Sequence, residues 1–151
     1  MHGLIELEES QLRELVNARA TWRAWCDARR EALQVKGSMV WKEVGGRTYL
    51  VRRSASGAQK SLGPRSPETE AMHAGFQQRK ERAQARFKAM RQRLDEQRKL
   101  NRVYRVGRTP GVVVRILAAL EAADLADKFM VIGTHAMYAY ETAAGVMVDS
   151  G

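Results

Sequence analysis

The sequence predicts an α+β protein, and three observations carry this prediction. Two long stretches repeat apolar residues at the three- and four-residue spacing of an amphipathic helix. Between them, residues 39–62 are rich in β-forming residues, interrupted by a Gly45-Gly46 pair. Towards the end, the apolar run 129–132 meets Gly133, a pattern typical of a buried strand that turns into a helix. We therefore expect a helix, a small β-hairpin, a long basic amphipathic helix, and then an incomplete helix-strand-helix unit.

The first helix is expected to start at Ser10, whose side chain can cap the free N–H groups, and to end near Gly37. Its apolar side consists of Leu12, Leu15, Val16, Trp22, Trp25, Cys26 and Leu33. Cys26 is the single cysteine, so an internal disulfide is excluded and a reducing, cytoplasmic setting is favoured. The first residues lack the features of a signal peptide, and no apolar run approaches the roughly 18 residues that cross a bilayer. We expect no membrane partner.

The hairpin is predicted from a tight turn at Gly45-Gly46, with a third short strand over residues 59–62. It mixes cations and aromatic rings, namely Lys42, Arg47, Arg52, Arg53 and Lys60 beside Trp41 and Tyr49. This mixture suits a nucleic-acid surface. It also suits a packing platform whose aromatic rings cover the first or second helix, and packing is the favoured hypothesis.

The second helix has a well-marked start, because Ser66 is a good N-cap, Pro67 suits the first helical position, and Glu68 and Glu70 complement the helix dipole. Its apolar seam is formed by Met72, Phe76, Ala83, Phe87, Met90 and Leu94. The helix is expected to fray over residues 101–107.

The same helix carries most of the excess charge. Twelve basic and three acidic residues lie between Arg79 and Arg108, and this difference equals the net charge of +9 of the whole chain. Such a stripe can neutralise phosphates, so we predict nucleic-acid contacts at Arg82, Arg86, Arg91 and Arg93. The alternative is a solvated basic face, which is the commoner role of charge on a long helix.

A third helix is expected after Thr109 and Pro110, which repeat the arrangement of a cap followed by a proline. Its apolar residues are Val113, Ile116, Leu117 and Leu120. We expect it to end near Ala123, to lead directly into the strand over residues 129–132, and to pack on that strand.

The turn at Gly133 is the strongest candidate for a binding site. Thr134 can cap the helix that follows, and free N–H groups at a helix start favour an anion such as a phosphate. His135 could contact the same phosphate, although a histidine at a helix start is more often a partly exposed polar residue. Tyr138 and Tyr140 could stack on a base, but we favour core positions for both.

The residues Gly133-Thr134-His135-Ala136 and the following Met137-Tyr138-Ala139-Tyr140-Glu141 resemble a bacterial family of the nucleotidyltransferase fold, within the polymerase-beta-like superfamily. Residues 143–145 and 61–70 also look like that family. The resemblance implies that Gly133, Thr134 and His135 bind a nucleotide. It further implies that the complete protein uses Mg²⁺ and a nucleoside triphosphate to transfer a nucleoside monophosphate to an unknown acceptor.

In this family, paired carboxylates on the strand after the glycine turn hold two metal ions. This sequence contains no Asp-x-Asp, and Asp149 is a lone carboxylate in what looks like the turn before the next strand. We therefore expect the N-terminal portion of a nucleotidyltransferase-like protein, with no catalytic residue, no metal ligand and no bound cofactor in this part.

Two regions are predicted, a helix-hairpin-helix region over residues 1–105 and the start of the nucleotidyltransferase-like domain over residues 106–151. Two functional hypotheses remain. The first is a nucleotidyltransferase lineage that binds nucleotide, and the second is a basic helical module that binds nucleic acid without catalysis. A lone strand over residues 129–132 would leave apolar surface open, so homo-oligomers are also expected.

Overall fold

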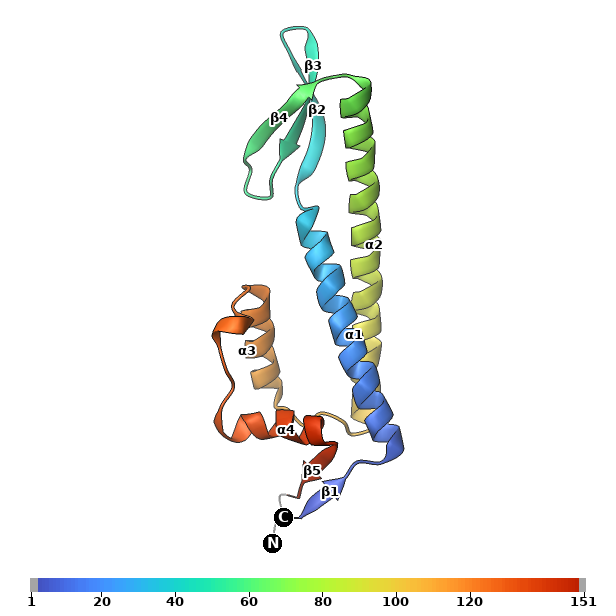
Figure 1. The fold of residues 1–151 in the computed structure, drawn as a ribbon, viewed down its shortest axis with the longest axis vertical. Helices are drawn as coiled ribbons and strands as arrows, with labels where there is room; N and C mark the ends of the chain where they lie inside the picture. Colours follow the sequence, from blue (N-terminus) through green and yellow to red (C-terminus); the bar gives the residue numbers. More distant parts are fainter. Residues whose placement is uncertain (1–2, 150–151) are drawn as a thin grey trace. The chain divides into compact units, whose positions relative to one another are not determined.

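The computed structural model describes residues 3–149, whose helices and strands are drawn in Figure 1. The chain forms two compact units. The first, which we call the sheet unit, comprises residues 21–95. The second, which we call the terminal unit, comprises residues 3–20 and 96–149. Helices α1 (Glu9–Gln34) and α2 (Pro67–Val103) each contribute to both units. The mixture of helices and antiparallel strands confirms the α+β class, while a domain boundary after residue 105 stays a prediction.

The sheet unit contains a three-stranded antiparallel sheet with the order β2 (Ser38–Val44), β3 (Arg47–Arg53) and β4 (Gln59–Pro64). Gly45 and Gly46 join β2 to β3, with φ of +58° and +75°. Positive φ at both central residues is typical of the two-residue hairpin turn whose twist matches that of the flanking strands. Glycine adopts positive φ without steric cost. The predicted hairpin and the third strand are therefore confirmed.

One face of this sheet packs on α2. Leu50 is fully buried, and Trp41 lies opposite it in the register of β2 and β3. The ring of Trp41 lies 5.6 Å from that of His73 on α2, and the guanidinium of Arg65 lies 5.3 Å from the Trp41 centroid. Trp41 thus covers the second helix, as the packing hypothesis predicts.

The start of α2 is as predicted. The N–H of Thr69 donates to the Ser66 hydroxyl oxygen over 3.3 Å, and Pro67 is the first helical residue. The Ser66 hydroxyl and the N–H of Glu68 hold the pKa of the Glu68 carboxyl below its ordinary value.

The seam of α2 is mostly buried, but one predicted member is wrong. Phe76, Ala83 and Leu94 are buried, whereas Met72 is 45% exposed. His73 takes the contact with the sheet in its place. Successive residues of an α-helix point about 100° apart around its axis. Neighbouring residues such as Met72 and His73 therefore differ in whether they lie on the seam or on the surface.

Helix α1 begins one residue before the predicted cap, so the role assigned to Ser10 is wrong. The N–H of Glu8 donates to Gln11 Oε1 over 3.0 Å, and the side chain of Gln11 therefore closes the helix start. Further along, Trp22 and Trp25 stack with centroids 5.0 Å apart, and Trp25 contacts Phe87 of α2.

The terminal unit contains a strand pair that the sequence analysis did not anticipate. β1 (Leu4–Glu6) pairs antiparallel with β5 (Val146–Val148), so that the first described residues lie against the segment after α4 (Met137–Ala144). Gly145 ends α4 in the left-handed conformation with φ of +69°. The N–H of Leu7 donates to the Gly145 carbonyl over 3.0 Å, which extends the link between the two segments.

Helix α3 (Gly111–Ala122) is reached through a turn in which Gly107 has φ of +79°, and α2 ends at Val103, as predicted. The N-cap residue of α3 is Pro110, and no side chain caps this helix, so the capping role predicted for Thr109 is wrong. Because the helix starts one residue later than expected, with Gly111 instead of Pro110 as its first residue, Thr109 no longer occupies the capping position. The predicted end near Ala123 is confirmed.

The predicted strand over residues 129–132 is wrong. These residues form a connection without secondary structure between η1 (Ala126–Lys128) and η2 (Gly133–Ala136), two short 3₁₀ helices. Met130 is 86% and Ile132 78% exposed, and Ile116 and Leu117 of α3 are exposed as well. An extended segment becomes a buried strand only when neighbouring strands satisfy its backbone. Association of copies through this apolar surface stays a prediction.

Candidate functional site

The predicted binding turn at Gly133 is open, and its backbone has a conformation that only glycine readily adopts. Gly133 has φ of +74°, a region that residues with a side chain rarely adopt. Apart from Gly133 and its two chain neighbours, no described residue has an atom within 4 Å of the position that a Cβ on Gly133 would take. Gly133 is thus needed for the backbone conformation and leaves free space beside the turn.

A 3₁₀ helix, η2, starts at this turn instead of the predicted α-helix. Each N–H in a 3₁₀ helix bonds a carbonyl three residues earlier, so the N–H groups of Gly133 and Thr134 have no acceptor within η2. The Thr134 side chain does not cap the helix, and α4 begins only at Met137. The predicted cap is therefore wrong, because the tighter first turn places the hydroxyl away from the N–H groups of α4.

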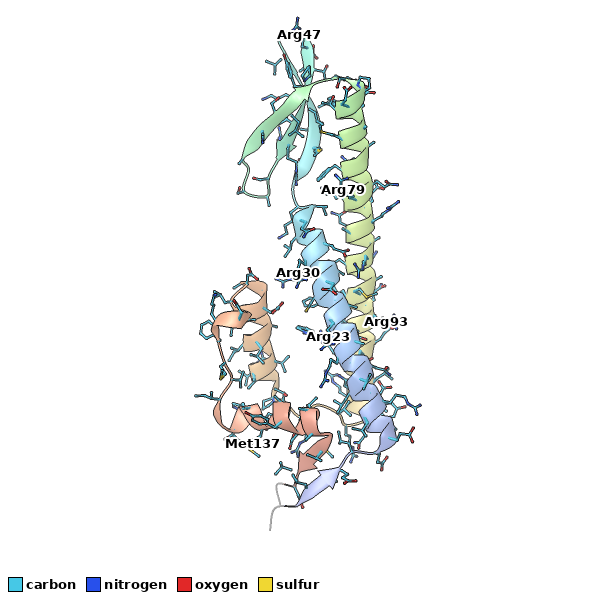
Figure 2. All side chains as sticks on the ribbon, in the orientation of Figure 1. Arg23, Arg30, Arg47, Arg79, Arg93 and Met137 are labelled. Carbon is cyan, nitrogen blue, oxygen red and sulfur yellow. The ribbon has the colours of Figure 1, made fainter. Side chains whose placement is uncertain are left out.

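Thr134 instead lines a cavity of about 200 Å³ in the terminal unit. Its lining residues come from η2, α4, β5 and the loop before α3, and they are Thr134, Met137, Tyr138, Glu141, Val148 and Arg108. Met137, the first residue of α4, is labelled in Figure 2. The cavity combines one hydroxyl, one cation and one carboxylate with apolar walls.

Arg108 and Glu141 form the polar centre of this cavity. Arg108 Nη2 pairs with Glu141 Oε1 and also donates to the Val148 carbonyl over 2.9 Å. The Val148 N–H donates to the same Glu141 oxygen over 2.8 Å. These bonds connect the loop before α3 to both α4 and β5, so they fix the shape of the cavity.

The charge state of Glu141 follows from these contacts. Its side chain is only 9% exposed, and burial by itself raises the pKa of a carboxyl group. The hydrogen bond from Val148 and the guanidinium of Arg108 outweigh burial and hold the pKa of Glu141 below its ordinary value. Glu141 is therefore ionised at neutral pH and partly neutralises Arg108.

Sequence reasoning counted Arg108 only as the last residue of the basic stretch. Its partners lie 33 and 40 residues later in the chain, and no local pattern indicates such contacts. In the sequence, the only indication of a role for Arg108 was that it is a basic residue shortly before the segment that resembles the family.

His135, Tyr138 and Tyr140 lie in different surroundings beside the cavity. The His135 ring stacks on Tyr138 with centroids 6.2 Å apart, and His135 is exposed rather than part of the lining. Tyr138 is half-buried and lines the cavity, whereas Tyr140 is 72% exposed. The prediction of a core position is thus wrong for Tyr140, because no sheet covers its side of α4.

The predicted nucleic-acid residues belong to the sheet unit. Arg82, Arg91 and Arg93 are exposed on α2, while Arg86 forms an ion pair with Glu31 of α1. The Glu31 carboxylate raises the pKa of Arg86, through its hydrogen bond first and its charge second.

Metal ligands and membrane spans are not found within the part of the chain that the structure describes. Residues 3–149 contain no group of three or more His, Cys, Asp or Glu side chains placed to hold a metal ion. None of the described helices has the length and apolar character needed to cross a bilayer. The N–H of Asp149, the lone carboxylate noted above, donates to the Gly3 carbonyl over 2.9 Å.

Residues 112–151 match a family model described as "Nucleotidyltransferase". This segment contains α3, the Gly133 turn, α4 and β5, so it includes every lining residue of the cavity except Arg108. No curated protein and no solved structure matches the chain.

Proposed function

We propose that this chain is the N-terminal part of a nucleotidyltransferase-like protein and that the cavity beside Thr134 receives the phosphates of a nucleotide. The observation that carries the proposal is the meeting of Thr134 and Arg108 in one cavity, inside or next to the segment that matches the nucleotidyltransferase family. The complete protein would transfer a nucleoside monophosphate from a nucleoside triphosphate to an acceptor.

The donors at this site suit a phosphate group. A guanidinium carries five N–H donors, and both bonds that Arg108 makes come from Nη2. Nε and Nη1 therefore remain as donors, and each can donate singly to a phosphate oxygen. The Thr134 hydroxyl and the N–H groups of Gly133 and Thr134 add three neutral donors, and we include the neighbouring His135 as an outer contact.

The metal chemistry of the family does not fit the described residues. Two bridging ions require clustered carboxylates, and Glu141 is already bound to Arg108 and Val148. We therefore assign no catalytic step to this chain. Its own residues bind and orient the phosphates, while Mg²⁺ would be held by carboxylates that the described residues do not supply.

Nucleotide binding is the direct test. The protein is titrated with nucleoside, nucleoside monophosphate and nucleoside triphosphate, with and without Mg²⁺, by isothermal calorimetry. Affinity is expected to rise with the number of phosphates. Thr134→Ala is expected to weaken triphosphate binding about tenfold, because a hydrogen bond to a charged group is worth roughly 1.5–3 kcal/mol.

Thr142→Ala is the matched control, because it removes the same hydroxyl from a residue that bonds the Tyr138 carbonyl within α4 over 2.8 Å. Its triphosphate affinity is expected to equal that of the parent protein. Equal losses in both variants, or no triphosphate binding at millimolar concentration, would contradict the proposal.

A further inference from the structure

The excess charge of the chain lies entirely in the sheet unit. Residues 21–95 hold 17 Lys and Arg residues against 7 Asp and Glu, a net charge of +10. The rest of the chain holds 9 basic and 10 acidic residues, a net charge of −1. The cavity beside Thr134 belongs to the nearly neutral unit, so that cavity does not account for the positive charge of the sheet unit.

Four arginines of α2 lie on one flank of the helix. Arg79, Arg86 and Arg93 follow one another at seven-residue intervals, and Arg82 lies three residues after the first of them. Residues spaced by three, four and seven share one side of an α-helix. We call this set of four the arginine flank; Figure 2 labels its first and last members along α2.

The arginine flank differs from the set predicted from sequence. Arg91 lies nine residues after Arg82, which is about 180° around the helix, so it belongs to the opposite side with Lys88. Arg79 takes its place on the flank. The acidic Glu81 also lies away from the flank, at about 100° from Arg82.

Three of the four flank arginines carry uncompensated charge. Arg79, Arg82 and Arg93 are exposed and have no ion-pair partner within residues 3–149. Arg86 pairs with Glu31, and its side chain is still 44% exposed. An array of exposed arginines on a rigid helix is a site for a regular series of anions.

The residues beside these arginines on the flank are short. Ala85 and Ala89 lie between the arginines on this side of α2, Gly75 lies one turn before Arg79, and no aromatic residue lies on the flank. Short side chains let the helix backbone approach its partner closely. The absence of aromatic rings on this flank argues against single strands, whose binding relies on stacking of bases.

We propose that the arginine flank of α2 is a docking surface for duplex DNA, which it contacts through phosphates. From Arg79 to Arg93 the helix rises about 21 Å, and the major groove of B-form DNA admits an α-helix of ordinary width. The major groove of A-form RNA is too narrow for side chains to enter, which favours DNA over duplex RNA. This surface is independent of the nucleotide cavity, and binding needs neither nucleotide nor metal.

Fluorescence anisotropy with a labelled 20-base-pair DNA, in EDTA and over a salt series, tests the proposal. The logarithm of the association constant is expected to fall with the logarithm of the salt concentration with a slope of about −3, one unit per neutralised phosphate. Replacing Arg82 and Arg93 together by Ala is expected to weaken binding at least tenfold and to reduce the slope by about two units.

The matched control replaces Lys88 and Arg91 together by Ala, which removes the same charge from the opposite side of the same helix. This variant is expected to change affinity less than threefold. All four positions are exposed helix sites where Ala is a good helix former, so both proteins should fold, as checked by circular dichroism.

Three outcomes would overturn the proposal: no DNA binding at low salt, equal losses in the two double variants, or equal affinity for single-stranded DNA or duplex RNA of the same length. Equal losses would mean that only bulk charge acts. None of these results bears on triphosphate binding at Thr134, so the two proposals fail separately.

Discussion

The sheet unit and the family-matched segment 112–151 differ in how far their apolar side chains are buried. In the sheet unit, Leu50 is fully buried and Phe76 is 4% exposed. In the segment, Met130 is 86% and Ile132 78% exposed, although both belong to the most apolar run of the region. In the sheet unit, a sheet and a helix pack against each other and cover each other's apolar side chains. Segment 112–151 has an apolar surface but, within its described residues, no second surface to pack against it. An apolar pattern becomes a core only where its partner is present.

The largest expected difference concerns truncation of apolar side chains. Leu50→Ala should lower the free energy of unfolding of the sheet unit by about 2–5 kcal/mol, because it removes a fully buried side chain and leaves a cavity. Ile132→Ala should change stability by less than about 0.5 kcal/mol, since the side chain is already in water. Urea unfolding followed by circular dichroism measures both. Similar effects from the two substitutions would remove the contrast between the regions.

The next effect concerns Glu141, a carboxylate that is buried in the terminal unit. Glu141→Gln should destabilise the contact between α4 and β5 by about 1–3 kcal/mol, because it breaks a partly buried charge-assisted bond to Arg108. Hydrogen exchange of the Val148 N–H, which donates to Glu141, reports this contact directly. Unchanged protection in the variant would show that the pair does not hold the cavity in shape.

The same residue predicts a pH dependence. The folded pKa of Glu141 is lower than its unfolded value, so its stabilising contribution is complete above the unfolded pKa. The contribution is lost as the pH falls through the folded pKa. Protection at Val148 should therefore decrease on acidification in the parent protein, and Glu141→Gln should flatten this decrease. A parallel decrease in both proteins would assign the pH dependence to other groups.

Smaller effects of opposite sign are expected at two glycines. Gly145→Ala should destabilise the terminal unit by about 1–2 kcal/mol, since φ is +69° and a Cβ would come within 2.9 Å of Leu12 Cδ2. Gly75→Ala should stabilise α2 by up to about 1 kcal/mol, because Ala is favoured in a helix interior and meets only the end of Arg79 at 3.4 Å. Thermal unfolding compares the two, and a loss of stability in both variants would contradict the assignment.

The sequence predicted those elements that local chemistry determines. Ser66 and Pro67 mark the start of α2, and Gly45-Gly46 marks the hairpin, because caps and tight turns depend on neighbouring residues alone. The prediction of a strand over residues 129–132 was wrong because an apolar run gives no information about whether neighbouring strands are present.

The candidate site could be predicted only in part. Thr134 was found through its position after Gly133, and it does line the cavity. Arg108 and the pairing of β1 with β5 were missed because their partners are distant in sequence. Helix boundaries that shifted by one or two residues, at Ser10 and Thr109, changed the capping residue while leaving the helices in place.

The central claim is that phosphates bind beside Thr134, and amide chemical shifts test it most directly. Titration of ¹⁵N-labelled protein with a nucleoside triphosphate is expected to shift the amides of Gly133, Thr134 and His135 most strongly, together with the Arg108 side-chain Nε–H. The same titration with the nucleoside alone should leave them nearly unchanged. Shifts confined to other parts of the chain, with these four signals unmoved at saturating triphosphate, would contradict the account.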